Sequence, residues 1–150
     1  NVNQHISKIS KGIEILFHIY SGRLLQNFQN GLGVFIDSDG ASISFRDTPH
    51  ATHDVIFSMS SGQLSSLVIA FTMALNHKYA QNSLLLIDDP VQTMDDINAA
   101  GFIDLLRHEF SDRQIFISTH EDYTSSYFRY KFNKTNLETQ RINFKGQYLN

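Results

Sequence analysis

Apolar residues recur every three or four positions in three parts of the chain, a spacing that predicts amphipathic helices. These helices are expected over residues 6–29, 63–76 and 97–110, and the first is expected to continue a longer helix from upstream. Their apolar stripes comprise Ile6, Ile9, Ile13, Leu16, Phe17, Tyr20, Leu24 and Phe28, then Leu64, Leu67, Val68, Phe71 and Leu75, and finally Ile97, Phe102, Ile103, Leu106 and Phe110.

Two continuous apolar runs, SLLLID at residues 83–88 and QIFIST at residues 114–119, predict buried β-strands. The first run is stopped by acids and a proline, and it is typical of a central strand in a parallel sheet that is covered on both faces. The order helix, strand, helix, strand predicts an α/β fold with a mostly parallel sheet flanked by helices. Functional residues are then expected at the carboxyl ends of the strands.

Shorter runs predict further strands. Residues 34–45 place two β-like runs around the turn Asp37-Ser38-Asp39-Gly40, as in a hairpin. The segments THDVIF at 52–57, FRYKF at 128–132 and TQRINF at 139–144 are also expected to be strands. Neither a linker nor an internal repeat divides residues 1–150, so a single domain is expected.

Composition narrows the class of protein. The chain has 150 residues, of which 41% are hydrophobic, enough to build the core of one domain. It contains no cysteine, which excludes disulfides and thiolate metal sites, and no apolar run approaches the ~20 residues that span a bilayer. The opening NVNQHISKIS has no signal-peptide core, and it lacks an initiator methionine, so we expect a piece of a longer protein.

The net charge of −3 is unevenly distributed. An acidic middle, residues 88–122, suggests a metal or catalytic carboxylates, whereas a basic tail, residues 129–145, suggests a polyanion or, more commonly, a solvated surface. The acids are Asp88, Asp89, Asp95, Asp96, Asp104, Glu109, Asp112, Glu121 and Asp122, and the bases of the tail are Arg129, Lys131, Lys134, Arg141 and Lys145.

The two predicted buried strands deliver acids and a histidine to their ends. Asp88 and Asp89 follow the first strand, and His120 follows the second. Asp88 is suited to hold a hydrated Mg²⁺, whereas Asp89 points the other way and can address an attacking water. A plain Asp-Asp-Pro turn, and a packed or surface histidine, are the alternatives that these residues leave open.

The stretch MSSGQLSSL, residues 59–67, precedes an apolar helix. The free N–H groups and the dipole at a helix start favour an anion, and small residues let a phosphate approach the backbone. Ser60 and Ser61 supply hydroxyls, Gly62 permits the approach and Gln63 begins the helix. Ordinary serine capping is the alternative.

Four motifs occur in the order and spacing of a known family. MSSGQ, LLLIDDP, Thr93-Met94-Asp95 and FISTH resemble the signature, Walker B, D-loop and H-loop of ABC ATPases. The resemblance is closest to the structural-maintenance-of-chromosomes (SMC) branch, with its SbcC-type and RecN-type DNA-repair members, and it is strongest over residues 55–125. It implies the C-terminal lobe of a split, P-loop ABC-type head, with residues 1–30 leading from a coiled coil.

The resemblance implies roles in a dimer of heads. Ser60 and Gly62 would contact the γ-phosphate of ATP bound on the partner head, with Ser61 and Gln63 in support. Asp95 would be the D-loop aspartate at the dimer seam.

It also implies roles at the chain's own strand ends. Asp88 would hold Mg²⁺ through water, and His120 would sense the γ-phosphate. Asp89 stands where the family usually has a catalytic glutamate, and its shorter side chain suggests slow turnover. Ser61 replaces the first glycine of the signature, a mild steric change.

No G-x-x-x-x-G-K-[ST] motif occurs in the chain, so the loop that cradles phosphates and its lysine must come from elsewhere. We therefore expect half of an ATPase head, inactive alone. The resemblance implies ATP and Mg²⁺ as cofactors, and a cytoplasmic or nucleoid-associated protein without a membrane. Its implied partners are an N-terminal Walker A lobe, a second copy of the head, DNA, and a nuclease or accessory subunit.

Two other functions remain open. A metal-dependent nuclease could gather Asp88, Asp89, Asp95 and Asp96 around two metals, although it leaves MSSGQ and FISTH unexplained. A clamp that closes on ATP but barely hydrolyses it is the other, with Asp89 as the attenuating residue.

Overall fold

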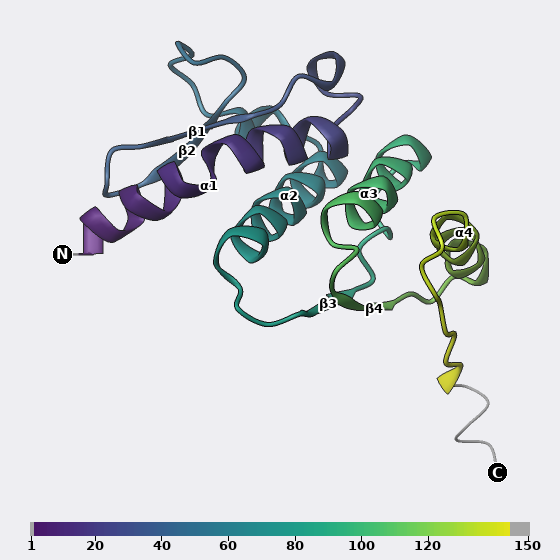
Figure 1. Ribbon diagram of the computed structural model, residues 1–150. Helices are drawn as coiled ribbons and strands as arrows, with labels where there is room; N and C mark the ends of the chain where they lie inside the picture. Colours follow the sequence, from purple (N-terminus) through teal and green to yellow (C-terminus); the bar gives the residue numbers. More distant parts are fainter. Residues whose placement is uncertain (1, 145–150) are drawn as a thin grey trace.

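The computed structural model describes residues 2–144, and within them it has an α/β fold (Figure 1). No helix in this range is both long enough and apolar enough to cross a membrane. The elements in chain order are α1 (Val2–Leu24), η1 (Gln29–Gly31), β1 (Phe35–Ser38), β2 (Ile43–Arg46), η2 (Val55–Ser58), α2 (Ser61–Tyr79), β3 (Leu84–Asp88), α3 (Asp96–Glu109), β4 (Gln114–Ser118) and α4 (Asp122–Asn133).

Helices α1, α2 and α3 pack together around the main core, and α4 lies beyond α3 on the side away from α1 (Figure 1). The three predicted helices are therefore confirmed, although α1 ends at Leu24 rather than near residue 29. The predicted inward positions of three apolar residues are wrong: Ile97 in the first turn of α3 is 50% exposed, and Leu64 and Val68 of α2 are 40% and 57% exposed. The other four residues of the α3 stripe are buried. The fully buried side chains include Ile13, Phe17, Tyr20, Leu24, Leu67, Met73, Phe102, Ile103, Leu106 and Phe110.

Strands β3 and β4 form a parallel pair, with Leu84 opposite Gln114 and Asp88 opposite Ser118. The predicted parallel pairing is confirmed. The prediction that both faces of β3 are covered is wrong for the described residues, because Leu85 is buried but Leu86 on the opposite face is 70% exposed. Phe116 of β4 is likewise 46% exposed, so the sheet carries a bare apolar face.

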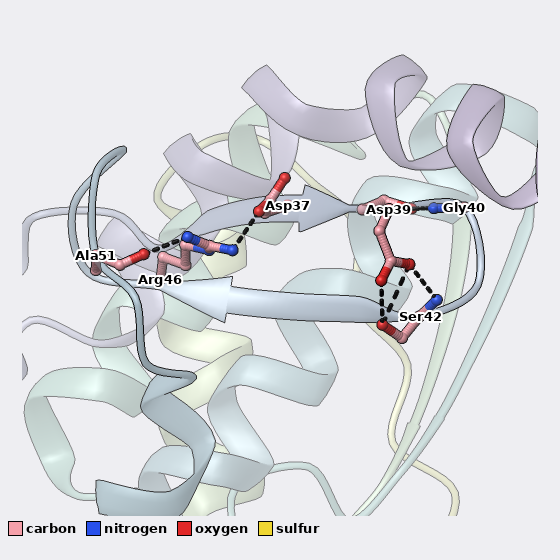
Figure 2. Close-up of polar contacts among 7 residues, drawn as sticks. Asp37, Asp39, Gly40, Ser42, Arg46 and Ala51 are labelled. Carbon is pink, nitrogen blue, oxygen red and sulfur yellow. Dashed lines mark hydrogen bonds and ion pairs between the residues drawn. The ribbon is translucent and has the colours of Figure 1, made fainter.

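Strands β1 and β2 form the predicted antiparallel hairpin (Figure 2). In its turn the Asp39 carboxylate accepts hydrogen bonds from the Ser42 and Ala41 N–H groups at 2.7 and 2.8 Å. These bonds, that from Ser42 foremost, lower the pKa of Asp39, and Gly40 takes the left-handed conformation that the turn requires, with φ +86°. Arg46 closes the other end through Asp37 and the Ala51 carbonyl.

Three predicted strands are wrong. Residues 55–57 of THDVIF belong to the short helix η2, because the Asp54 carboxylate accepts the Ile56 N–H at 3.1 Å and starts a helical turn. FRYKF lies inside α4, where Phe128 and Phe132, four residues apart, share the buried side of a helix. Residues 139–143 of TQRINF form no strand.

Candidate functional site

The parallel register of β3 and β4 brings three predicted site residues together at one end of the sheet. The Ser118 hydroxyl donates to Asp88 Oδ1, and the Asp89 N–H lies 3.1 Å from both the hydroxyl and the carbonyl oxygen of Ser118. His120 Nδ1 lies 2.7 Å from Asp89 Oδ2. Ser118 was missed from the sequence, because only the strand register reveals that it stands opposite Asp88.

Asp89 adopts a left-handed backbone conformation, with φ +40°. This conformation costs a residue other than glycine about 1 kcal/mol, although aspartate tolerates it better than most. Within the described residues Asp89 Oδ1 is buried and has no hydrogen-bond partner. A buried carboxylate oxygen without a partner is costly, so this atom is suited to hold a water or a ligand group.

The contact between His120 and Asp89 sets the state of the imidazole. Because a carboxylate only accepts, Nδ1 must carry the hydrogen. The side chain of His120 is 59% exposed, and its Nε2 is then the atom that can accept from, or when protonated donate to, a bound group.

The start of α2 is a capping box rather than an open cluster of serines. The Ser60 hydroxyl accepts the Gln63 N–H at 3.3 Å, and the Gln63 side chain accepts the Ser60 N–H at 2.9 Å. The capping alternative for Ser60 therefore holds, but a hydroxyl that accepts can still donate its own hydrogen. Ser61 is exposed beside it.

Gly62 joins this helix start to the segment after β3. A Cβ at position 62 would stand 2.5 Å from the Thr93 carbonyl oxygen. The absence of a side chain therefore lets the first turn of α2 pack against the backbone of Thr93.

Asp95 caps α3 and does not join the Asp89 cluster. Its carboxylate accepts the Asn98 N–H at 2.8 Å and the Asn27 side-chain amide at 2.7 Å. Asn98 is 4% exposed, and its own oxygen accepts the Gln26 N–H at 3.1 Å. An aspartate just before a predicted helix is a capping signal that the sequence contains, whereas nothing in it points to Asn27.

The donor set fits one hydrated Mg²⁺ and not a two-metal centre. Within residues 2–144, no three His, Asp or Glu side chains gather as metal ligands would. The four-carboxylate cluster of the nuclease alternative does not form within the described residues, since Asp95 is bound to α3 and to Asn27. Mg²⁺ keeps most of its waters and needs few direct carboxylates, so the exposed Asp88 fits it, while the unpaired Asp89 Oδ1 is left for a water.

Neither a family model nor a curated protein matches this chain, but solved structures do. A structure described as "Structural biochemistry of ATP-driven dimerization and DNA stimulated activation of SMC ATPases" superposes with a TM-score of 0.61 at 17% identity, over 83% of this chain and 76% of that one. The SMC head domain from Thermotoga maritima gives a TM-score of 0.54 at 19% identity, over 83% of this chain and 44% of that one.

A third structure is the Smc head domain of Pyrococcus furiosus with an extended coiled coil, bound to the C-terminal domain of ScpA. It gives a TM-score of 0.51 at 19% identity, over 77% of this chain and 30% of that one. The chain thus has the fold of SMC head domains, which are ABC-type ATPase heads. It spans less than half of the length of the second and third structures.

Proposed function

We propose that this chain is the C-terminal lobe of an SMC-like or DNA-repair-type ABC ATPase head, which binds and hydrolyses ATP between two dimerised heads. The observation that carries the proposal is the cluster of Asp88, Asp89 and His120 at the carboxyl ends of two parallel strands, in a chain with the fold of SMC heads. In open α/β sheets, ligands bind at these ends.

The bare apolar face of the β3–β4 sheet supports the proposal that a second lobe covers it. Leu86 and Phe116 are large apolar side chains exposed on a two-stranded sheet, which is rarely stable without cover. Because the chain has no G-x-x-x-x-G-K-[ST] loop, the lobe that covers this face would also supply the phosphate-binding loop. This chain alone would neither bind ATP tightly nor hydrolyse it.

The residues of the strand ends would then divide the work of hydrolysis. Asp88 would hold Mg²⁺ through water, and the ion would neutralise charge on the β- and γ-phosphates. Asp89 Oδ1 would orient the attacking water and draw on its proton, while His120 on Oδ2 fixes the carboxylate. His120, when both ring nitrogens are protonated, would donate from Nε2 to the γ-phosphate as the bond to ADP breaks.

The second head would complete each site. Ser60, Ser61, Gly62 and Gln63 would face the γ-phosphate bound on the partner head, with Asp95 at the seam between heads. Helix α1 would continue into a coiled coil that moves when the heads separate. DNA would be the macromolecular partner, in the cytoplasm or nucleoid.

The proposal is tested by Mg²⁺-dependent phosphate release from ATP, using the intact protein or this chain co-expressed with its N-terminal half. We expect turnover in the wild type and its loss in Asp89→Asn and in Ser60→Arg, because the second variant blocks the site of the other head. Asp112→Asn, an exposed acid outside the site, is the matched control and should retain turnover. Failure of ATP to bind the joined lobes would overturn the assignment.

A clamp that closes on ATP without appreciable hydrolysis is the second candidate. It is favoured by the single-methylene side chain of Asp89, which His120 holds at the strand end. ATP-induced dimerisation without phosphate release would select the clamp over the ATPase.

A further inference from the structure

Helix α4 carries a face of tyrosines and lysines in which Tyr123, Tyr130 and Lys134 are exposed, while Tyr127 and Lys131 are partly buried. With 3.6 residues per turn, four positions of α4 and its C-cap, Lys134, fall within an arc of about 100°. We name this arc the tyrosine–lysine face; its residues are Tyr123, Tyr127, Tyr130, Lys131 and Lys134.

The opposite side of α4 attaches the helix to the domain. Phe128 and Phe132 are buried there, and the Phe128 ring meets Phe102 of α3 edge-on at 6.2 Å between centroids. The Arg107 side chain donates to the Lys131 carbonyl oxygen at 3.1 Å. These contacts hold the tyrosine–lysine face outward.

The exposed rings need an explanation, because tyrosine usually buries most of its ring. Tyr123 is 78% exposed and Tyr130 is 53% exposed. The rings of Tyr123 and Tyr127 are parallel, with centroids 6.4 Å apart. The two rings thus lie parallel along the helix, about one turn apart.

Cations lie directly beside these rings. Lys131 Nζ is 5.7 Å from the centre of the Tyr127 ring, and Lys134 Nζ is 4.6 Å from the centre of the Tyr130 ring. No acidic residue occurs between Tyr123 and Leu137, in a chain whose net charge is −3. The face is therefore locally basic, although Lys145 of the basic tail lies outside the described residues.

We propose that the tyrosine–lysine face of α4 binds single-stranded nucleic acid. Exposed aromatic rings stack with unpaired bases and lysines contact the backbone phosphates, which is how proteins hold single strands without reading their sequence. A duplex hides the faces of its bases, so its phosphates would contact the lysines but no base would stack on the tyrosines. An acidic peptide would do the same.

The inference deepens the DNA partnership in the proposed function but uses no residue of the nucleotide site. Its test is the binding of fluorescein-labelled (dT)20 to the intact protein, followed by fluorescence anisotropy. Lys131→Glu/Lys134→Glu should weaken binding at least tenfold at 0.1 M salt and lower the salt slope by about 1.4. Lys8→Glu/Lys11→Glu is the control, with the same charge change at exposed positions of α1, and should bind like the wild type.

Tyr123→Ala/Tyr130→Ala tests the rings. It should weaken the binding of (dT)20 about tenfold or more and leave that of a 20-base-pair duplex unchanged. Photocrosslinking with 5-iodouracil in the oligonucleotide should place adducts on these tyrosines. The affinity of labelled (rU)20, compared with that of (dT)20, shows whether RNA or DNA is the strand that binds more tightly.

Four results would overturn the proposal. The first is an equal loss of (dT)20 affinity in the lysine variant of α4 and in the α1 control, and the second is crosslinked adducts only outside α4. The third is equal affinity of the wild type for duplex and single strand. The fourth is competition by polyglutamate as strong as that by (dT)20. ATP turnover should be unchanged in every variant, so a failure here is distinct from a failure of the ATPase assignment.

Discussion

The Thr93 carbonyl oxygen lies only 2.5 Å from the place where a Cβ on Gly62 would stand. The contact joins the first turn of α2 to the segment that follows β3. Because both partners are backbone, neither side can relax by changing a side-chain rotamer. A change at position 62 must therefore move the helix start or the segment that leads to Asp95.

Gly62→Ala tests this contact. Helix propensity alone would stabilise the variant by about 0.5–1 kcal/mol, whereas overpacking costs about 1–3 kcal/mol. Since the clash is with backbone, we expect a net loss of about 1 kcal/mol in the free energy of unfolding, measured by urea denaturation, and at least a tenfold loss of ATP turnover.

Thr72→Ala, on an exposed position of the same helix, is the control for propensity and should be neutral or slightly stabilising. A stabilised Gly62→Ala with full turnover would show that the contact does not constrain position 62.

Replacements of Asp89 distinguish an ATPase from a clamp that closes on ATP without appreciable hydrolysis. Asp89→Asn retains the shape of the side chain but removes the charge that orients water, so we expect turnover to fall by ~10² or more. Asp89→Glu restores the length usual in the resembled family and should raise turnover severalfold. Steady-state phosphate release on the intact protein measures both, and an Asp89→Glu variant as slow as Asp89→Asn would contradict the assigned role.

Local patterns in the sequence predicted the elements whose residues bury one another within this chain. Helical spacing located α1, α2 and α3, and continuous apolar runs located β3 and β4. The same apolar run misled at Leu86, because periodicity reports that a side chain is apolar and not whether its covering partner is present. The strand predicted for FRYKF was wrong because Phe128 and Phe132, four residues apart, satisfy both an alternating and a helical spacing.

The candidate site divides in the same way. Asp88, Asp89 and His120 were predicted because they follow strands, and parallel strands end at one edge. Ser118 and Asn27 were not, since their contacts depend on strand register and on a loop 68 residues away from Asp95. Non-local hydrogen bonds of this kind leave no periodic signal.

The Asp95 carboxylate should be measurable as a helix cap. Asp95→Ala removes the bonds from the Asn98 N–H and from Asn27, so we expect a loss of about 1–2 kcal/mol in urea denaturation. Asp95→Asn can still accept at the cap and should lose less than about half of that. Equal losses in the two variants would contradict capping as the cause.

Buried Tyr20 predicts how stability responds to alkali. Its hydroxyl lies 2.5 Å from His77 Nδ1, and burial, helped by the Glu109 charge, raises its pKa to about 12, against the opposing charges of Arg23 and Arg113. A pKa raised in the folded state adds stability that is complete below pH 10 and is lost as the pH rises from 10 to 12.

Tyr20→Phe removes this titration. The difference in the free energy of unfolding between wild type and variant should therefore shrink by up to about 2 kcal/mol between pH 9 and pH 12, followed by urea denaturation at each pH. A difference that stays constant across this range would mean that Tyr20 titrates alike in the folded and unfolded chain.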